Sequence, residues 1–146
     1  MCLTKITKRL RRRDDQIRMV YHLFAIVRKE RQALFSHGGR VYRYKTDVIH
    51  VAQTPQGKRP TPRKMPYTRK KYVPYFHSFI NEVEALGYSS DIMLWNLNNK
   101  YHYELRRVRA YENTIEGVEG NKFPRSVLIH RKMYIPKGRK YIVRSV

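Results

Sequence analysis

Residues Gln53 to Pro74 read QTPQGKRPTPRKMPYTRKKYVP and form the most distinctive stretch of the chain. Prolines recur through the whole segment. Because proline fixes φ and lacks a backbone N–H, a helix cannot propagate here and a central strand would lose hydrogen bonds. The residue before each proline is also pushed toward extended geometry. We therefore predict a semi-rigid, partly polyproline-like ribbon that buries no apolar surface of its own and is disordered when alone.

The ribbon is strongly cationic and contains no Asp or Glu. Its cations are Lys58, Arg59, Arg63, Lys64, Arg69, Lys70 and Lys71. Lined up along a polyanion, these side chains would contact successive phosphates. Two tyrosines, Tyr67 and Tyr72, lie among these cations. Their rings could pack within the tail, or they could stack on an unpaired base or contact a partner, and the sequence leaves both open.

The charge of the whole chain is segregated along its length. The 146 residues contain 32 Lys and Arg against 11 Asp and Glu, a formal charge of +21. Residues 1–13 contribute +6, residues 53–74 contribute +7 and residues 121–146 contribute +8, whereas residues 75–120 sum to −3. An ordinary solvated surface intersperses the two signs. This distribution favours a polyanionic partner, with nucleic acid first.

Length and composition limit the remaining classes. A chain of 146 residues with 41% hydrophobic residues has enough apolar surface for one domain with a core. Cys2 is the only cysteine, so an intramolecular disulfide and a multi-cysteine zinc site are excluded. No apolar run approaches the roughly 18 residues of a membrane span. The basic segment 1–13 suits either an organelle-targeting sequence or a tail that binds the partner.

Apolar spacing predicts an α+β body. Ile17, Val20, Tyr21 and Phe24 recur at three- and four-residue steps, which predicts a long helix from Asp14 to Phe35. Residues 41–52 are rich in β-branched and aromatic side chains and predict a strand.

Beyond the ribbon, two short amphipathic segments between residues 75 and 98 predict a helical hairpin, with Gly87 as the stop between them. Residues 101–111 suit a helix or a strand, and the alternation of Tyr101, Tyr103 and Leu105 favours the strand. Residues 112–121 predict an acidic loop. Residues 125–135 and 141–146 predict a C-terminal β-hairpin with a cationic tip. The segments 1–13, 14–52, 53–74, 75–120 and 121–146 are expected to build one domain overall.

No constellation of catalytic or metal-binding residues is visible. The six histidines are scattered without metal-ligand spacing. Asp47 and His50 form only a weak candidate for a nuclease pair, and His50, among apolar neighbours, is expected to be packed and hydrogen-bonded. We predict a protein that is not an enzyme and uses no cofactor or metal.

Nucleic-acid binding has the stronger support, through phosphate contacts and stacking tyrosines. Tyr134 and Tyr141 are expected to pack across strands instead. The candidate RNA-binding residues are Arg9, Arg11, Arg12, Arg13, Lys58, Arg59, Arg63, Lys64, Tyr67, Arg69, Lys70, Lys71, Tyr72, Lys137, Arg139 and Lys140.

A small body with long acid-free basic extensions, such as residues 1–13 and 53–74, resembles ribosomal proteins in general style. The resemblance implies a non-catalytic constituent of a large ribonucleoprotein, namely a mitochondrial ribosomal subunit, located in mitochondria. Its partners would be rRNA and neighbouring ribosomal proteins, which the acidic 75–120 face would contact, with no membrane and no small-molecule substrate. The alternatives are a DNA-compacting or packaging protein and a small RNA-processing enzyme subunit.

Overall fold

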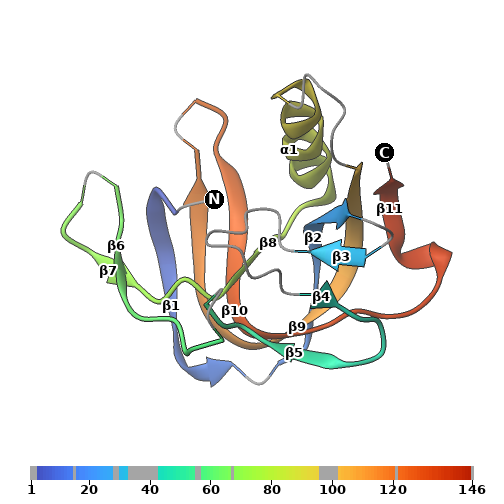
Figure 1. Ribbon diagram of the computed structural model, residues 1–146. Coiled ribbons are helices and arrows are strands. Elements are labelled where there is room, and N and C mark those ends of the chain that lie inside the picture. Colours follow the sequence, from blue (N-terminus) through green and yellow to red (C-terminus); the bar gives the residue numbers. More distant parts are fainter. Residues whose placement is uncertain are drawn as a thin grey trace.

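The computed structural model describes residues 3–14, 16–27, 30–32, 43–54, 57–66, 68–95, 102–120 and 122–145. Across these residues the chain is mostly antiparallel β-sheet with one long helix (Figure 1). The elements are β1 (Lys5–Asp14), β2 (Arg18–Val27), β3 (Glu30–Gln32), β4 (Arg43–Tyr44), β5 (Ile49–Val51), β6 (Arg63–Lys64), β7 (Lys71–Tyr72), β8 (Phe76–Phe79), α1 (Glu82–Trp95), β9 (His102–Glu119), β10 (Arg125–Tyr134), the 3-10 turn η1 (Arg139–Tyr141) and β11 (Ile142–Ser145).

The long strand β9 is the centre of the sheet. β1 and then β2 run antiparallel to it along one edge, while β10 and then β11 run antiparallel to it along the other. β8 pairs with β10 and, at Tyr21 and Phe79, with β2, so the strands β9, β10, β8 and β2 close into a ring. β3 and β4 extend from β2, and β5 pairs with β10.

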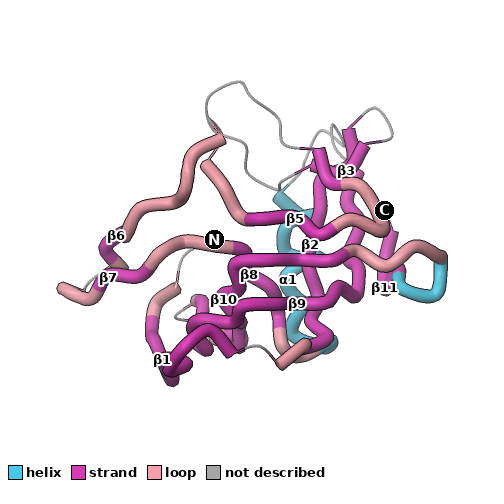
Figure 2. The backbone as a smooth tube through the Cα atoms, turned by 90° about the horizontal axis from the view of Figure 1, so that it is seen from below, coloured by secondary structure: helices cyan, strands magenta, loops and turns pink. Residues whose placement is uncertain are grey.

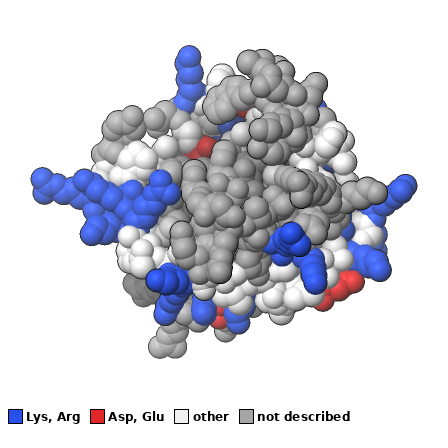
Figure 3. Space-filling model, viewed as in Figure 1, with Lys and Arg blue, Asp and Glu red and all other residues white. Residues whose placement is uncertain are grey.

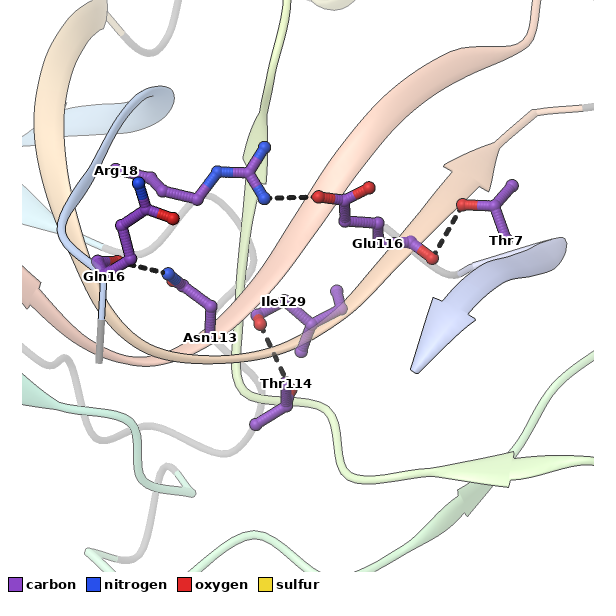
Figure 4. Close-up of polar contacts among 7 residues, drawn as sticks. All are labelled: Thr7, Gln16, Arg18, Asn113, Thr114, Glu116 and Ile129. Carbon is purple, nitrogen blue, oxygen red and sulfur yellow. Dashed lines mark hydrogen bonds and ion pairs between the residues drawn. The ribbon is translucent and has the colours of Figure 1, made fainter. Parts of the chain in front are cut away.

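Side-chain hydrogen bonds fix the junction between β1 and β2 on β9 (Figure 4). Asn113 donates its side-chain N–H to the carbonyl of Gln16 at 2.9 Å, and Thr7 donates to the carbonyl of Glu116 at 2.9 Å. The register of β1 shifts between Arg9 and Asp14, so these contacts hold the chain where the strand ladder is irregular.

Two apolar clusters fill the opposite faces of the sheet. The first includes Leu23, Leu105 and Ile129 of the strands, with Ala85, Tyr88 and Ile92 of α1 packed on them. The second includes Val20, Phe24, Val108, Leu128 and Met133. Neighbouring residues on one strand, such as Leu128 and Ile129, belong to different clusters, as expected from the alternation of a strand.

The predicted helix over Asp14–Phe35 is wrong, because its described part forms β1, β2 and β3. Residues 15, 28–29 and 33–35 of the predicted helix lie outside the described residues. Phe24 packs in one apolar cluster and Leu23 in the other, so both faces of β2 are buried. A strand buried on both faces is a continuous apolar run without alternation, and its residues satisfy helical spacing as well.

The predicted helical hairpin is also wrong, because a single helix, α1, passes through Gly87. Asn81 begins it by accepting the backbone N–H of Val83 at 2.9 Å. An interior glycine costs a helix roughly 1 kcal/mol relative to alanine. Burial of Ala85, Tyr88 and Ile92 on the sheet offsets this cost. The last residues of the predicted hairpin, 96–98, lie outside the described residues.

Two expectations for the C-terminal part and one for residues 41–52 are also corrected. The strand prediction for residues 101–111 is confirmed over His102–Tyr111, but the predicted acidic loop 112–121 is wrong, since β9 continues to Glu119. β11 pairs with β9 rather than with β10, so the predicted C-terminal hairpin is not formed. The predicted strand over 41–52 is interrupted between β4 and β5 by a turn in which Asp47 has φ 60°. The α+β prediction is thus replaced by a mostly antiparallel β fold.

Among the glycines that the structure describes, Gly117 should be the least tolerant of substitution. A Cβ placed there would lie 2.6 Å from the carbonyl oxygen of Lys5 and 2.9 Å from a methyl group of Leu3. We expect Gly117→Ala to lower the free energy of unfolding by about 1–3 kcal/mol, because β1 must shift away from β9. Urea denaturation measures the change.

The matched control for that substitution is Gly87→Ala in α1. A Cβ at this position meets no atom closer than the Arg125 side chain at 3.9 Å. This variant should gain about 1 kcal/mol from helix propensity. Equal effects of the two substitutions would contradict the close approach of β1 and β9.

Candidate nucleic-acid interface

The proline-rich segment folds as a short basic hairpin, which we define as residues 57–72, rather than as a free ribbon. Arg63 pairs with Tyr72 and Lys64 with Lys71 in an antiparallel two-stranded sheet. The N–H of Met65 donates to the carbonyl of Lys70 at 2.9 Å and completes the turn. The basic hairpin lies beside β1 at one end of the molecule (Figure 1).

Two apolar side chains attach the basic hairpin to the body. Met65 is 2% exposed and Tyr72 is 3% exposed, and both pack in the first apolar cluster beside Leu3. The Tyr72 hydroxyl lies 3.0 Å from Nε2 of His77 and accepts the N–H of Leu3 at 3.3 Å. Tyr72 is therefore a core residue in this structure and is not accessible to a base. Tyr67 lies outside the described residues.

The cationic side chains of the basic hairpin point outward. All seven are exposed: Lys58, Arg59, Arg63, Lys64, Arg69, Lys70 and Lys71. Figure 3 shows Lys and Arg atoms gathered at the left of the molecule, where Figure 1 places β6 and β7 in the same view. The segment therefore has two faces. One face packs on the core through Met65 and Tyr72, and the other presents the cations, as contact with a polyanion would require.

β1 contributes a further cation to this surface. Arg9 is exposed and donates from Nη2 to the carbonyl of Lys71 at 2.9 Å, which ties β1 to β7. Lys5 and Lys8 of β1 are exposed as well. The backbone of β1 includes Arg11, Arg12 and Arg13, whose side chains the structure does not describe.

The remaining predicted cations form a separate group at the other end of the molecule. Lys137, Arg139 and Lys140, here called the loop cluster, are exposed in the segment that joins β10 to β11. Figures 1 and 2 place this segment and the basic hairpin at opposite ends. The predicted sites are therefore two surfaces and not one.

A buried arginine shapes the segment that contains the loop cluster. Arg106 is 2% exposed and donates from Nη2 to the carbonyl of Pro136 at 2.6 Å and to that of Gly138 at 3.2 Å. Its Nη1 lies 3.3 Å from the carboxylate of Glu104, which is also buried. The planar guanidinium can reach both carbonyls and the carboxylate at once.

Arg106→Lys should loosen this segment although it keeps the charge. An ammonium group cannot reproduce the forked contacts, and loss of one hydrogen bond to a buried charged group costs about 2 kcal/mol. We expect urea denaturation to show that loss and trypsin to cut faster after the loop-cluster residues. Arg107→Lys at the exposed neighbouring position is the control, and equal changes in both variants would contradict the role of Arg106.

Most carboxylates of residues 75–120 have partners within the described part of the chain. Arg18 pairs with Glu116 (Figure 4), and further pairs join Asp91 to Arg125 and Glu112 to Arg131. The Glu84 carboxylate accepts the N–H of Ser126. Of the seven acidic residues in the expected 75–120 face, all described, Glu82 is exposed and the Asp91 side chain is 45% exposed, while the other five are buried or half-buried.

Two histidines that lie far apart in sequence, His22 and His130, meet at the hydroxyl of Ser78. His130 donates from Nδ1 to the carbonyl of Lys132 at 2.9 Å, so its Nε2 accepts the Ser78 hydroxyl at 2.7 Å. The Ser78 oxygen in turn accepts N–H from Nδ1 of His22 at 2.8 Å. Burial lowers the pKa of His22 to about 3 and that of His130 to about 4.

His77 is held in its neutral form in the same way. Its Nδ1 donates to the carbonyl of Tyr75 at 2.9 Å, and its Nε2 accepts the Tyr72 hydroxyl. Burial lowers its pKa to about 3. The sequence contains no local signal for the contacts of Ser78 with His22 and His130, because β2, β8 and β10 must first pair.

The Ser78–His130 contact resembles a nucleophile with its base in distance alone. Ser78 and His130 are each 0% exposed, so no substrate can reach the hydroxyl in this structure. Nδ1 of His130 donates to a carbonyl rather than to a carboxylate. We interpret the histidine group as part of the folded core.

The weak nuclease pair is not assembled in this structure. His50 is buried and contacts the carbonyl of Lys45 at 2.8 Å, which confirms the prediction of a packed histidine. The Asp47 carboxylate instead accepts the Tyr134 hydroxyl at 3.0 Å and the N–H of Lys137 at 3.3 Å.

Tyr134 lies opposite Arg109 in the sheet, with the Arg109 guanidinium 5.3 Å from the ring centre, so it packs across strands as expected. Tyr141, in η1, contacts Lys140, whose ammonium group lies 5.1 Å from its ring centre.

Within the described residues, no group of three or more His, Cys, Asp or Glu side chains could hold a metal ion. The helix found there is neither long nor apolar enough to cross a membrane. Comparison with protein-family models, curated proteins and solved structures finds no match.

Proposed function

We propose that this protein is a non-catalytic RNA-binding constituent of a large ribonucleoprotein, namely a mitochondrial ribosomal subunit. The basic hairpin would contact rRNA phosphates, and the loop cluster would contact a second RNA segment. A chain with cationic surfaces at two ends suits an assembly role, because each surface can hold a different RNA segment.

One observation supports the proposal above the others. The seven exposed cations of the basic hairpin share a short segment without any carboxylate, and Met65 and Tyr72 hold that segment on the core. A held segment loses less conformational entropy on binding than a free ribbon would. Phosphate contacts from such a segment neutralise RNA charge and read no particular base sequence.

Sedimentation of the tagged protein from a lysate of isolated mitochondria tests the proposal. We expect co-migration with a ribosomal subunit and release into the light fractions after ribonuclease treatment. Sequencing of RNA crosslinked to the protein should return rRNA. Migration as a small free protein before ribonuclease treatment would contradict the proposal.

The main alternative is a DNA-compacting protein. A binding competition between duplex DNA and structured RNA for the purified protein distinguishes it from an rRNA-binding protein. A DNA-compacting protein would prefer duplex DNA at every salt concentration. An rRNA-binding protein should prefer the structured RNA, whose irregular grooves and 2′-hydroxyls a fixed surface can fit.

A further inference from the structure

Besides the basic hairpin and the loop cluster, a third surface combines aromatic, cationic and apolar side chains on the sheet. Directly opposed residues of an antiparallel pair point to the same face, so the strand register defines rows across the sheet. One row contains Met19, Arg109, Tyr134 and Ile49, from β2, β9, β10 and β5. The next row contains Tyr111, Lys132 and Val51. We call these seven residues the outer face.

Three aliphatic residues of the outer face are exposed and its tyrosines and cations are half-buried, while the side chains between its rows are inside. Ala110 and Met133, each next in sequence to outer-face residues, are 0% exposed and belong to the second apolar cluster. Met19 is 38% exposed, Ile49 is 51% exposed and Val51 is 40% exposed. In Figure 2, which shows the molecule from below, β5 and β9 run across the middle of the molecule.

Tyrosines and cations alternate at the centre of the outer face. Arg109 opposes Tyr134, and Tyr111 opposes Lys132 in the adjacent row, so each ring has a cation as its cross-strand neighbour. Asp47 accepts the Tyr134 hydroxyl at 3.0 Å and restrains the ring. A restrained ring loses little freedom when a planar group stacks on it.

Excess positive charge at the border of the outer face comes from the loop cluster, whose three cations are exposed and favour an anionic ligand. Two carboxylates lie nearby: Asp47 accepts two hydrogen bonds from neutral donors, and Glu112 pairs with Arg131 at 3.3 Å and with Lys132 at 3.7 Å. The backbone contact from Lys137 to Asp47 places the loop cluster at the border of this face.

We infer that the outer face binds single-stranded RNA, with unpaired bases stacked on Tyr134 and Tyr111 and phosphates directed to Arg109 and the loop cluster. This inference rests on the proposed RNA-binding function. Bases in a duplex are already stacked and cannot reach a sheet face, whereas unpaired bases can. Exposed aliphatic side chains alone would suit a protein partner, but the alternation of rings and cations beside the loop cluster favours a polyanion with planar groups.

Fluorescence anisotropy with a labelled oligouridylate of about ten nucleotides tests the inference, since one single-strand site spans about 4–16 nucleotides. We expect Tyr111→Thr/Tyr134→Thr to weaken binding about a hundredfold, about tenfold for each lost ring. Threonine is chosen because it preserves strand propensity. The matched Tyr111→Phe/Tyr134→Phe variant keeps both rings and should bind within about threefold of the wild type.

Two further readouts separate stacking from general damage. The threonine variant should keep its affinity for a fully paired RNA duplex, and the salt dependence of its oligouridylate binding should not change, because stacking releases no counterions. Thermal unfolding followed by circular dichroism checks the fold. If the double variant unfolds, the single variant Tyr111→Thr is used, with an expected loss of about tenfold.

Each outcome decides the inference. Unchanged oligouridylate binding by the threonine variants overturns the inference. It is also overturned if these variants lose affinity for duplex RNA as much as for oligouridylate. The same holds if the threonine variants bind RNA normally but no longer bind a protein partner of the wild type. In these cases the wild type still binds RNA and the proposed function stands. A wild type that binds neither RNA overturns both proposals.

Discussion

Charge reversal at four exposed cations of the basic hairpin is expected to weaken RNA binding about a thousandfold. The variant is Arg63→Glu/Lys64→Glu/Lys70→Glu/Lys71→Glu. Each lost phosphate contact, with the repulsion that replaces it, should cost about 1 kcal/mol at moderate salt, and about 4 kcal/mol corresponds to a thousandfold change. The slope of log affinity against log salt should become shallower by about 3, because about 0.7–0.9 counterion is released per contact.

The matched control changes charge elsewhere. Lys45 and Lys122 are exposed and belong to neither the basic hairpin nor the loop cluster. Lys45→Glu/Lys122→Glu should weaken binding far less per charge than Arg63→Glu/Lys64→Glu, which has the same net charge. Equal losses would mean that the chain binds RNA through its overall charge, and normal incorporation of the four-site variant into particles would contradict the role of the basic hairpin.

The fold itself is expected to be unusually sensitive to mild acid. His22 and His77 have their pKa lowered from 6.5 to about 3, and His130 has its pKa lowered from 6.5 to about 4. Because burial holds these groups neutral, the unfolded chain binds protons below pH 6.5 that the folded chain does not. Their contribution to stability is therefore complete above pH 6.5 and is lost as the pH falls toward 4 and then 3.

The size of this loss is comparable to the whole stability of a small domain. Each histidine contributes about 1.4 kcal/mol per pH unit within its window. Three histidines would lower the free energy of unfolding by about 6 kcal/mol between pH 6.5 and about pH 5, against a typical total of about 5–15 kcal/mol. Urea denaturation at successive pH values measures the slope.

Histidine variants assign that slope to particular side chains. His130→Gln should reduce it by about 1.4 kcal/mol per pH unit, whatever its effect on stability at neutral pH. His102→Gln replaces an exposed histidine of β9 and should leave the slope unchanged. A flat stability profile for the wild type from pH 6.5 to about pH 5 would contradict the neutral histidine network.

The two effects involve neighbouring parts of the molecule. Tyr72 is the second residue of β7 and at the same time the hydrogen-bond partner of His77. Because burial lowers the pKa of His77 to about 3, His77 stays neutral in the folded chain between pH 6.5 and about pH 5, and the Tyr72 contact is kept. We therefore expect RNA affinity in this range to fall only to the extent that the chain unfolds.

The sequence predicted correctly those structural features that depend on a residue and its immediate neighbours. The acid-free run of cations between Lys58 and Lys71 is exposed as a whole, because charged side chains are costly to bury without partners. The apolar neighbours of His50 in the sequence likewise predicted a packed side chain, and His50 is buried. The tyrosine pattern over 101–111 indicated a strand, and β9 confirms it.

Other properties depended on partners that are distant in sequence. Tyr72 looks like the other aromatic residue of the segment, Tyr67, yet Leu3 and His77 make it a core residue. The carboxylates of residues 75–120 look like an acidic face, yet most of them meet arginines or backbone N–H groups.

The sequence by itself determined the charge, its segregation, the lack of a disulfide and the cationic segment that cannot form a helix. Tertiary structure alone decided that residues 18–27 are a strand, that Ser78 joins His22 to His130, and that Tyr134 faces Arg109. Charge and proline act through the residue itself and its immediate neighbours. Strand identity and side-chain partners instead depend on long-range pairing, since an apolar run becomes a strand only when other strands cover both of its faces.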